Sequence, residues 1–197
     1  MNKLQRLRAL DTEAQLVTNI GAVLGWDQET YMPPAAIDGR AEQLAFIESL
    51  AHDKQTNPEI GDLLLELGST AQNPLGDPSL PALDRSYLRV MRRAFDQATK
   101  IPSAFVADMA KAISLSQAAW VKARSDNKFK DFQPHLERML EFNKRIAAFL
   151  DPAKRPYDVL LDRFEEGGTE AQVASVFTPL RNNLVKLLDT IRARPQV

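Results

Sequence analysis

The sequence contains no cysteine and only two histidines in 197 residues. Without cysteine the chain can form no disulfide, no thiolate metal site and no cysteine nucleophile, and it fits a reducing compartment. The histidines, His52 and His135, fall in different predicted helices, and neither has a second histidine at helical spacing. We therefore interpret each as a satisfied histidine on the surface or at a helix end, rather than as a metal ligand.

The chain also has neither a strong net charge nor a long apolar run. Its 25 Lys and Arg against 26 Asp and Glu give a formal charge of -1, so no overall field attracts nucleic acid or an anionic membrane. No stretch reaches the length of a transmembrane span, and the N-terminus lacks the apolar run of a signal peptide. With 44% hydrophobic and 26% charged residues, the composition is typical of a globular protein. We expect the protein to be cytoplasmic.

Apolar residues recur at helical spacing almost everywhere, and no segment alternates in the manner of a β-strand. We predict an all-α fold, an elongated bundle of about seven or eight helices. The predicted helices cover residues 2–25, 36–54, 59–71, 80–99, 102–126, 133–150, 157–164 and 169–194. Pro-rich loops are predicted at 73–78 and 151–156, and the sequence from Thr169 to Gln172 is typical of a capping box.

Four arginines lie on one face of the helix predicted at 80–99. They are Arg85, Arg89, Arg92 and Arg93. Such a stripe can engage a phosphate backbone or an acidic partner. This stripe is short, has no interleaved aromatic residues and belongs to a neutral chain. We interpret it as a solvated or inter-helix face, and we expect neither a nucleic-acid nor a membrane partner.

The most unusual run is Gly-Trp-Asp-Gln-Glu-Thr-Tyr-Met-Pro-Pro at 25–34, followed by Arg-Ala-Glu-Gln at 40–43. Polar groups beside large aromatics, just before two prolines, are typical of a hydrogen-bonded corner between helices. In the simplest interpretation a polar side chain caps the next helix and Trp26 belongs to the core. In the functional interpretation, polar and aromatic residues of the two segments belong to a binding site. These candidate site residues are Trp26, Asp27, Glu29, Thr30, Tyr31, Arg40 and Gln43.

This run resembles the N-terminal region of the Taq-type, thermostable metallocarboxypeptidases, peptidase family M32. Residues 116–137 resemble the family's Ala-x-x-x-Trp-x-x-Ala-Arg and Phe-x-Pro-His-Leu-Glu segments, and 157–165 its Tyr-Asp-x-Leu-Leu-Asp-x-Tyr-Glu segment. Order and spacing agree from about Val23 to Val185. The departures fall in predicted loops: Glu-Gly-Gly at 166–168 replaces the usual Pro-Gly-Met, and Ala35-Ala36 replace a common glycine.

The resemblance implies a larger all-helical enzyme with a deep groove, in which zinc is held by two histidines and a glutamate. Such an enzyme removes C-terminal residues from peptides, and the resemblance suggests a homodimer. The family's His-Glu-x-x-His helix does not occur in this sequence. We therefore expect residues 1–197 to be one N-terminal segment of a longer metallocarboxypeptidase, with no catalytic residue and no metal of its own. Its expected partners are the catalytic remainder, which carries the zinc, and a peptide substrate.

In this interpretation the N-terminal helices form one wall of the groove. We hypothesise that Asp27 or Glu29 pairs with Arg40 across the corner while Trp26 packs beneath the pair. Direct contact of the same residues with substrate is the alternative role. A second interpretation of the whole chain is a stand-alone helical scaffold or protein-binding module, a degenerate paralogue without catalytic activity.

Overall fold

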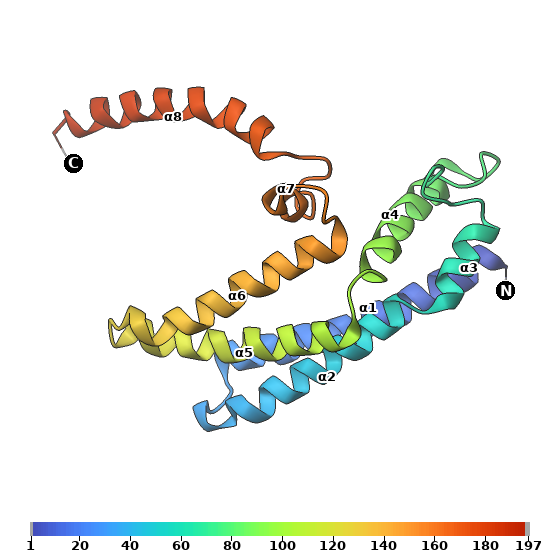
Figure 1. The fold of residues 1–197 in the computed structure, drawn as a ribbon, viewed down its shortest axis with the longest axis horizontal. Helices are drawn as coiled ribbons and strands as arrows, with labels where there is room; N and C mark the ends of the chain where they lie inside the picture. The colour runs from blue at the N-terminus through green and yellow to red at the C-terminus, as the bar shows by residue number, and fades with distance from the viewer. Residues whose placement is uncertain (1, 196–197) are drawn as a thin grey trace. The chain divides into compact units, whose positions relative to one another are not determined.

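The structure, a computed structural model, describes residues 2–195, and the regular secondary structure in that range is helical (Figure 1). The predicted all-α class is confirmed. The elements are α1 (Lys3–Thr30), the 3-10 turn η1 (Pro34–Ala36), α2 (Ile37–Gln55), α3 (Pro58–Glu66), α4 (Ala82–Ala98), α5 (Ser103–Ser125), α6 (Phe129–Leu150), α7 (Pro156–Leu161) and α8 (Glu170–Arg192). The chain divides into two compact units, 1–142 and 143–197, which are described separately. Among the described residues, no helix combines the length and apolar character that a membrane crossing needs.

Helix α1 starts with a capping box and extends into the unusual run as far as Thr30. The Asn2 side chain accepts a hydrogen bond from the Gln5 amide at 2.8 Å, and the Gln5 side chain accepts one from the Asn2 amide at 2.9 Å. The predicted end at Gly25 is wrong, because the helix extends to Thr30. The chain turns only at the two prolines that follow, since proline disfavours helical backbone in the residue before it.

The core of the first unit lies where α1, α3 and α4 meet. Its buried members are Leu7, Leu10, Ile60, Leu63, Leu64 and Leu88. Helix α2 packs against both α1 and α5. Ion pairs from Lys54 to Glu13 and from Arg40 to Asp27 join opposite ends of α1 and α2, which therefore run antiparallel. This pairing brings the unusual run at 25–34 together with the Arg-Ala-Glu-Gln segment at 40–43.

Helices α1 and α2 approach each other closely at Gly21. A Cβ atom at that position would lie 3.0 Å from Glu48 Oε1 and 3.2 Å from Ile47 Cγ2. The absence of a side chain lets α2 lie against the backbone of α1. The approach also removes water from the Glu48 carboxyl, and this burial raises the pKa of Glu48 above its ordinary value.

We expect Glu48→Gln to raise the melting temperature at pH 7 and to leave it unchanged at pH 3. Because the folded-state pKa lies above the unfolded one, folding favours the protonated carboxyl, and stability falls as pH rises between the two values. The amide removes the cost of holding a desolvated carboxylate above that window. Thermal unfolding at the two pH values measures the difference, and a lower melting temperature at pH 7 would show that the carboxylate stabilises the fold.

Helix α3 is shorter than the predicted 59–71 because it ends at a left-handed glycine. Gly68 has φ +75°, and its N–H donates to the Leu65 carbonyl while the Ser69 N–H donates to the Leu64 carbonyl. This is the Schellman pattern that terminates many helices. The following loop is held by the Ser69 hydroxyl, which donates to the Pro74 carbonyl at 2.8 Å.

The turn between α5 and α6 is tighter than the sequence predicts. Asn127 has φ 53°, and the Lys128 N–H donates to the Ala123 carbonyl at 2.8 Å. The predicted end of α5 at Asp126-Asn127 is confirmed. Helix α6 begins at Phe129 rather than near Gln133, which places Pro134 inside its second turn. A proline near a helix N-terminus removes few internal hydrogen bonds, so it did not mark the true start.

In the second unit the aspartates of the 157–165 segment fix the turn between α7 and α8. Asp158 accepts a hydrogen bond from the Glu170 amide at 2.7 Å, and Asp162 accepts one from the Gly167 amide at 2.8 Å. The predicted capping box of Thr169 and Gln172 is confirmed. Both motif carboxylates therefore have a structural role at the start of α8.

Candidate functional site

Arg40 and Asp27 form the brace that the sequence predicted as one of two pairings. Arg40 Nη2 lies 2.5 Å from Asp27 Oδ2, and the guanidinium also donates to the Leu24 carbonyl and, at 3.0 Å, to Gln43 Oε1. The Arg40 side chain is 12% exposed and that of Asp27 36%. The guanidinium thus ties the first turn of α2 to the last turns of α1. The alternative pairing of Arg40 with Glu29 does not occur.

Trp26 does not pack beneath this pair, and that prediction is wrong. Its side chain is 58% exposed, and its ring makes an edge-on contact with Tyr31 at 5.5 Å between centroids. Trp26 follows the interface residue Gly21 by five positions, which turns it about 140° away from the side of α1 that faces α2. The Thr30 hydroxyl donates back to the Trp26 carbonyl at 2.8 Å.

A pocket of about 720 Å³ opens beside the brace, between the end of α1, the start of α2 and α5. It is lined by Gln28, Glu29, Met32, Pro34, Ile37, Gln117, Ala118, Val121, Lys122, Ser125 and Asp126. Of the predicted site residues, only Glu29 is in the lining. The brace residues Asp27, Arg40 and Gln43, like Trp26, Thr30 and Tyr31, lie outside it.

Gln28 is one of the lining residues that were not among the predicted site residues. Its Oε1 accepts a hydrogen bond from the buried Ser114 hydroxyl at 2.6 Å, and its Nε2 lies 3.5 Å from the Ser114 carbonyl. These contacts connect α1 to α5 across 86 positions of sequence. Gln28 lies within the unusual run, but only the fold reveals the partner on α5.

The pocket can bind an amphipathic group, such as a peptide segment. Met32, Ile37 and Val121 supply an apolar surface. Glu29 and the Lys122–Asp126 ion pair, 2.8 Å between Nζ and Oδ2, supply charge at the lining. The hydrogen bond that Lys122 donates to the Asp126 carboxylate raises the pKa of Lys122, which stays protonated at neutral pH.

Zinc does not fit the side chains of residues 2–195. Within that range no group of three or more His, Cys, Asp and Glu side chains is placed to hold a metal ion. The two histidines contact α5 at separate points, His52 at the first residue, Ser103, and His135 near the middle, at Ser116. Thirteen helical positions separate those serines by about 20 Å.

His52, Ser103 and Asp53 have the composition of a hydrolase triad but a different geometry. The Ser103 hydroxyl donates to Asp53 Oδ1 at 2.5 Å and lies 3.0 Å from His52 Nδ1, while His52 Nε2 donates to the Ala98 carbonyl at 3.0 Å. In a nucleophilic triad the acid orients the histidine, not the serine. The buried imidazole instead fastens the end of α2 to the α4–α5 connection, which confirms a satisfied histidine at a helix end.

We expect His52→Ala to lower the free energy of unfolding by about 2 kcal/mol, through the lost buried ring and its two hydrogen bonds. His135→Ala is the matched control, with an expected loss below about 1 kcal/mol because His135 is only partly buried. Urea denaturation followed by circular dichroism measures both. Equal losses would contradict the structural role of His52.

The 116–137 segment forms an aromatic surface between α5 and the first turns of α6. His135 stacks on Phe132 with 6.5 Å between centroids, and the Arg124 guanidinium lies 5.8 Å from the Trp120 ring. A pocket of about 520 Å³ is lined there by Ile113, Ser116, Gln117, Trp120, Phe132 and Met139. Gln117 also lines the larger pocket, so α5 presents side chains to both.

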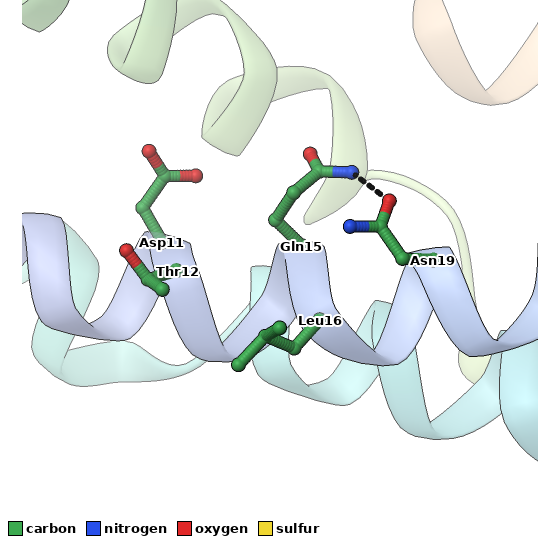
Figure 2. A pocket seen from close by; sticks show the side chains of 5 residues that line it. All are labelled: Asp11, Thr12, Gln15, Leu16 and Asn19. Atoms are coloured by element: carbon green, nitrogen blue, oxygen red, sulfur yellow. Dashed lines mark hydrogen bonds between the residues drawn. The ribbon is translucent and has the colours of Figure 1, made fainter.

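A third pocket of about 300 Å³, lined mostly by polar residues, follows one side of α1 (Figure 2). Figure 2 shows Asp11, Thr12, Gln15, Leu16 and Asn19, with Gln15 Nε2 donating to Asn19 Oδ1 at 3.0 Å. Asp11 also accepts from the Tyr87 hydroxyl at 3.1 Å. Burial, followed by the Asp11 charge, raises the pKa of Tyr87, so this phenol stays neutral and serves as a donor.

The arginine stripe of α4 is partly engaged within its own helix. Arg92 pairs with Asp96 one turn further on and lies 5.8 Å from the Phe95 ring. Arg85 Nε is buried without a hydrogen-bond partner. This geometry fits the interpretation of a face between helices better than an open phosphate-binding surface.

Comparisons with known proteins identify the family. The family model described as carboxypeptidase Taq (M32) metallopeptidase matches residues 6–197. Thermostable carboxypeptidase 1 of Thermus thermophilus is 30% identical over 198 residues, covering 95% of this chain and 38% of that protein. Thermostable carboxypeptidase 1 of Pyrococcus furiosus is 32% identical over 170 residues, covering 86% of this chain and 33% of that protein.

The fold is also that of solved carboxypeptidases. The M32 carboxypeptidase from Deinococcus radiodurans R1 superposes with a TM-score of 0.76 at 32% identity, over 98% of this chain and 37% of that one. The chain thus spans less than two fifths of the length of the relatives it matches.

Proposed function

The chain belongs to the M32 family of carboxypeptidase Taq metallopeptidases, and from this premise we propose that it forms one wall of the substrate groove of a metallocarboxypeptidase. The observation that carries the proposal is the family match over residues 6–197, in a chain whose relatives are named carboxypeptidases and are far longer. The reaction is the removal of C-terminal residues from peptides.

In this proposal the metal, zinc, belongs to the rest of the polypeptide. The sequence has no His-Glu-x-x-His motif, and residues 2–195 have no side-chain group that fits a metal. Residues 1–197 then act as a single N-terminal segment that contributes no catalytic residue. The assembled enzyme is a cytoplasmic homodimer, as the family resemblance suggests.

Six of the predicted site residues fall into three groups. Asp27, Arg40 and Gln43 brace the junction of α1 and α2, because they contact one another and not the pocket. Glu29 faces a peptide in the 720 Å³ pocket. Trp26 and Tyr31, both exposed, form an aromatic surface at the C-terminal end of α1.

A chimera tests this function. Residues 6–197 replace the matched stretch of the Thermus thermophilus carboxypeptidase, and the comparison protein is the same enzyme with that stretch deleted. We expect the chimera to release C-terminal amino acids from N-blocked peptides and the deleted enzyme to release none. A chimera that unfolds cooperatively but has no activity would contradict the proposal and favour the helical scaffold.

A further inference from the structure

Helix α8 carries an apolar seam with the spacing of a coiled coil. Phe177, Leu180, Leu184, Leu187 and Ile191 follow one another at alternating intervals of three and four residues. This 3-4 repeat places all five on one side of the helix. Their exposed fractions lie between 47% and 59%. We call these five residues the α8 seam.

The second unit holds α8 only at its first turn. The Glu170 amide donates to Asp158, and the Glu170 carboxylate lies 3.1 Å from Arg155. No residue of α8, from Glu170 to Arg192, is buried. A helix of this length gains most of its stability from packing an apolar face, and isolated helices are marginal in water. The seam therefore needs a covering element.

We propose that the α8 seam is the docking surface for an apolar helix of the polypeptide that M32 relatives carry beyond the length matched here. This inference rests on the proposed function. The matched stretch is 38% of the Thermus thermophilus protein, so more than half of that protein is available to supply such a helix. The 3-4 spacing specifies the partner's chemistry, which is a second helix with apolar residues in the same repeat.

A second copy of this chain suits the seam less well. Five half-exposed side chains contribute on the order of 500 Å² per helix, so two seams bury about 1,000 Å², below the standard size of a stable interface. Two separate chains must also give up translational and rotational freedom when they associate. A helix of the same polypeptide covers the seam without that loss.

The absence of cysteine in this chain allows a direct test. A thiol is introduced into the seam by Leu184→Cys and, as the matched control, on the opposite face by Asn182→Cys. Each variant is made in the free chain and in the chimera, whose other cysteines are changed to serine. The rate of reaction with Ellman's reagent is measured beside carboxypeptidase activity and mass by light scattering.

We expect both thiols to react at similar rates in the free chain. In the chimera the thiol of Leu184→Cys should react at least about 100-fold more slowly than in the free chain, because a covered side chain is exposed only when part of the protein unfolds. The reaction rate of the Asn182→Cys thiol should be unchanged. An active chimera with a fully reactive seam thiol would overturn the docking surface and leave the proposed function intact. A free chain that dimerises and protects the seam thiol would assign the seam to a second copy. Carboxypeptidase activity tests the proposed function, and thiol reactivity tests whether a helix covers the α8 seam.

Discussion

Replacing Arg40 with alanine is expected to lower the free energy of unfolding by about 2–3 kcal/mol. The Arg40 side chain is 12% exposed and its guanidinium binds both Asp27 and the Leu24 carbonyl, so its removal leaves a partly desolvated carboxylate without its cation. A fully buried pair loses about 3–5 kcal/mol on such a change and a surface pair about 1 kcal/mol or less. The value expected here lies between these, because Asp27 retains 36% exposure. Urea denaturation measures it.

Glu29→Ala is the control for this experiment. Glu29 belongs to the same run of residues but is exposed and does not contact Arg40, so its loss should change stability by less than about 0.5 kcal/mol. A double-mutant cycle of Arg40→Ala and Asp27→Ala should give a coupling energy of about 1 kcal/mol or more. Additive effects of the two changes would show that the brace does not stabilise the junction.

Replacing Gly76 with alanine is expected to lower the free energy of unfolding by about 3 kcal/mol. Gly76 has φ +69°, a left-handed conformation that costs other residues about 1–2 kcal/mol. Its new Cβ would lie 2.7 Å from both the Leu67 carbonyl oxygen and Leu88 Cδ1. Leu88 is fully buried, and the Leu67 oxygen is held by the Asp77 amide at 3.0 Å, so overpacking adds about 1–3 kcal/mol.

The matched control is Gly39→Ala in α2, where no atom lies within 4 Å of the new Cβ. This change should raise stability by about 0.5–1 kcal/mol, the difference in helix propensity between the residues. Thermal melts of both variants are compared with the parent chain. Equal melting temperatures for the two variants would contradict the described loop geometry.

The helical fold was predictable because the apolar spacing persists along the chain, whereas helix ends were less so. Gly25 suggested an end to α1, but a single glycine is tolerated inside a helix and the two prolines set the true limit. Gly68 ended α3 by a local hydrogen-bond pattern that the apolar spacing does not contain. Pro134 suggested the start of α6 one turn too late.

The candidate site was predictable only in part. The sequence offered two carboxylates for Arg40, and the rotation of α1 selects Asp27. That same rotation exposes Trp26, which hydrophobicity alone had assigned to the core. The pocket and the Gln28–Ser114 hydrogen bond join segments 86 positions apart, so no local sequence pattern predicts them.

Motif residues in this chain hold junctions between helices. Arg40 fixes α1 to α2, and Asp158 and Asp162 fix the start of α8. Gln28 fixes α1 to α5. Such contacts support the proposed role as one wall of a groove, because a binding wall must be rigid to position a substrate.

The central claim is tested most directly by assaying C-terminal amino-acid release from an N-blocked peptide by the 197-residue chain alone, with Zn²⁺ present. The chimera at the same molar concentration serves as the positive control. We predict release by the chimera that a chelator abolishes, and no release by the chain alone above the buffer blank. Turnover by the chain alone, retained through purification and abolished by the chelator, would contradict the account because it would place a working metal centre within residues 1–197.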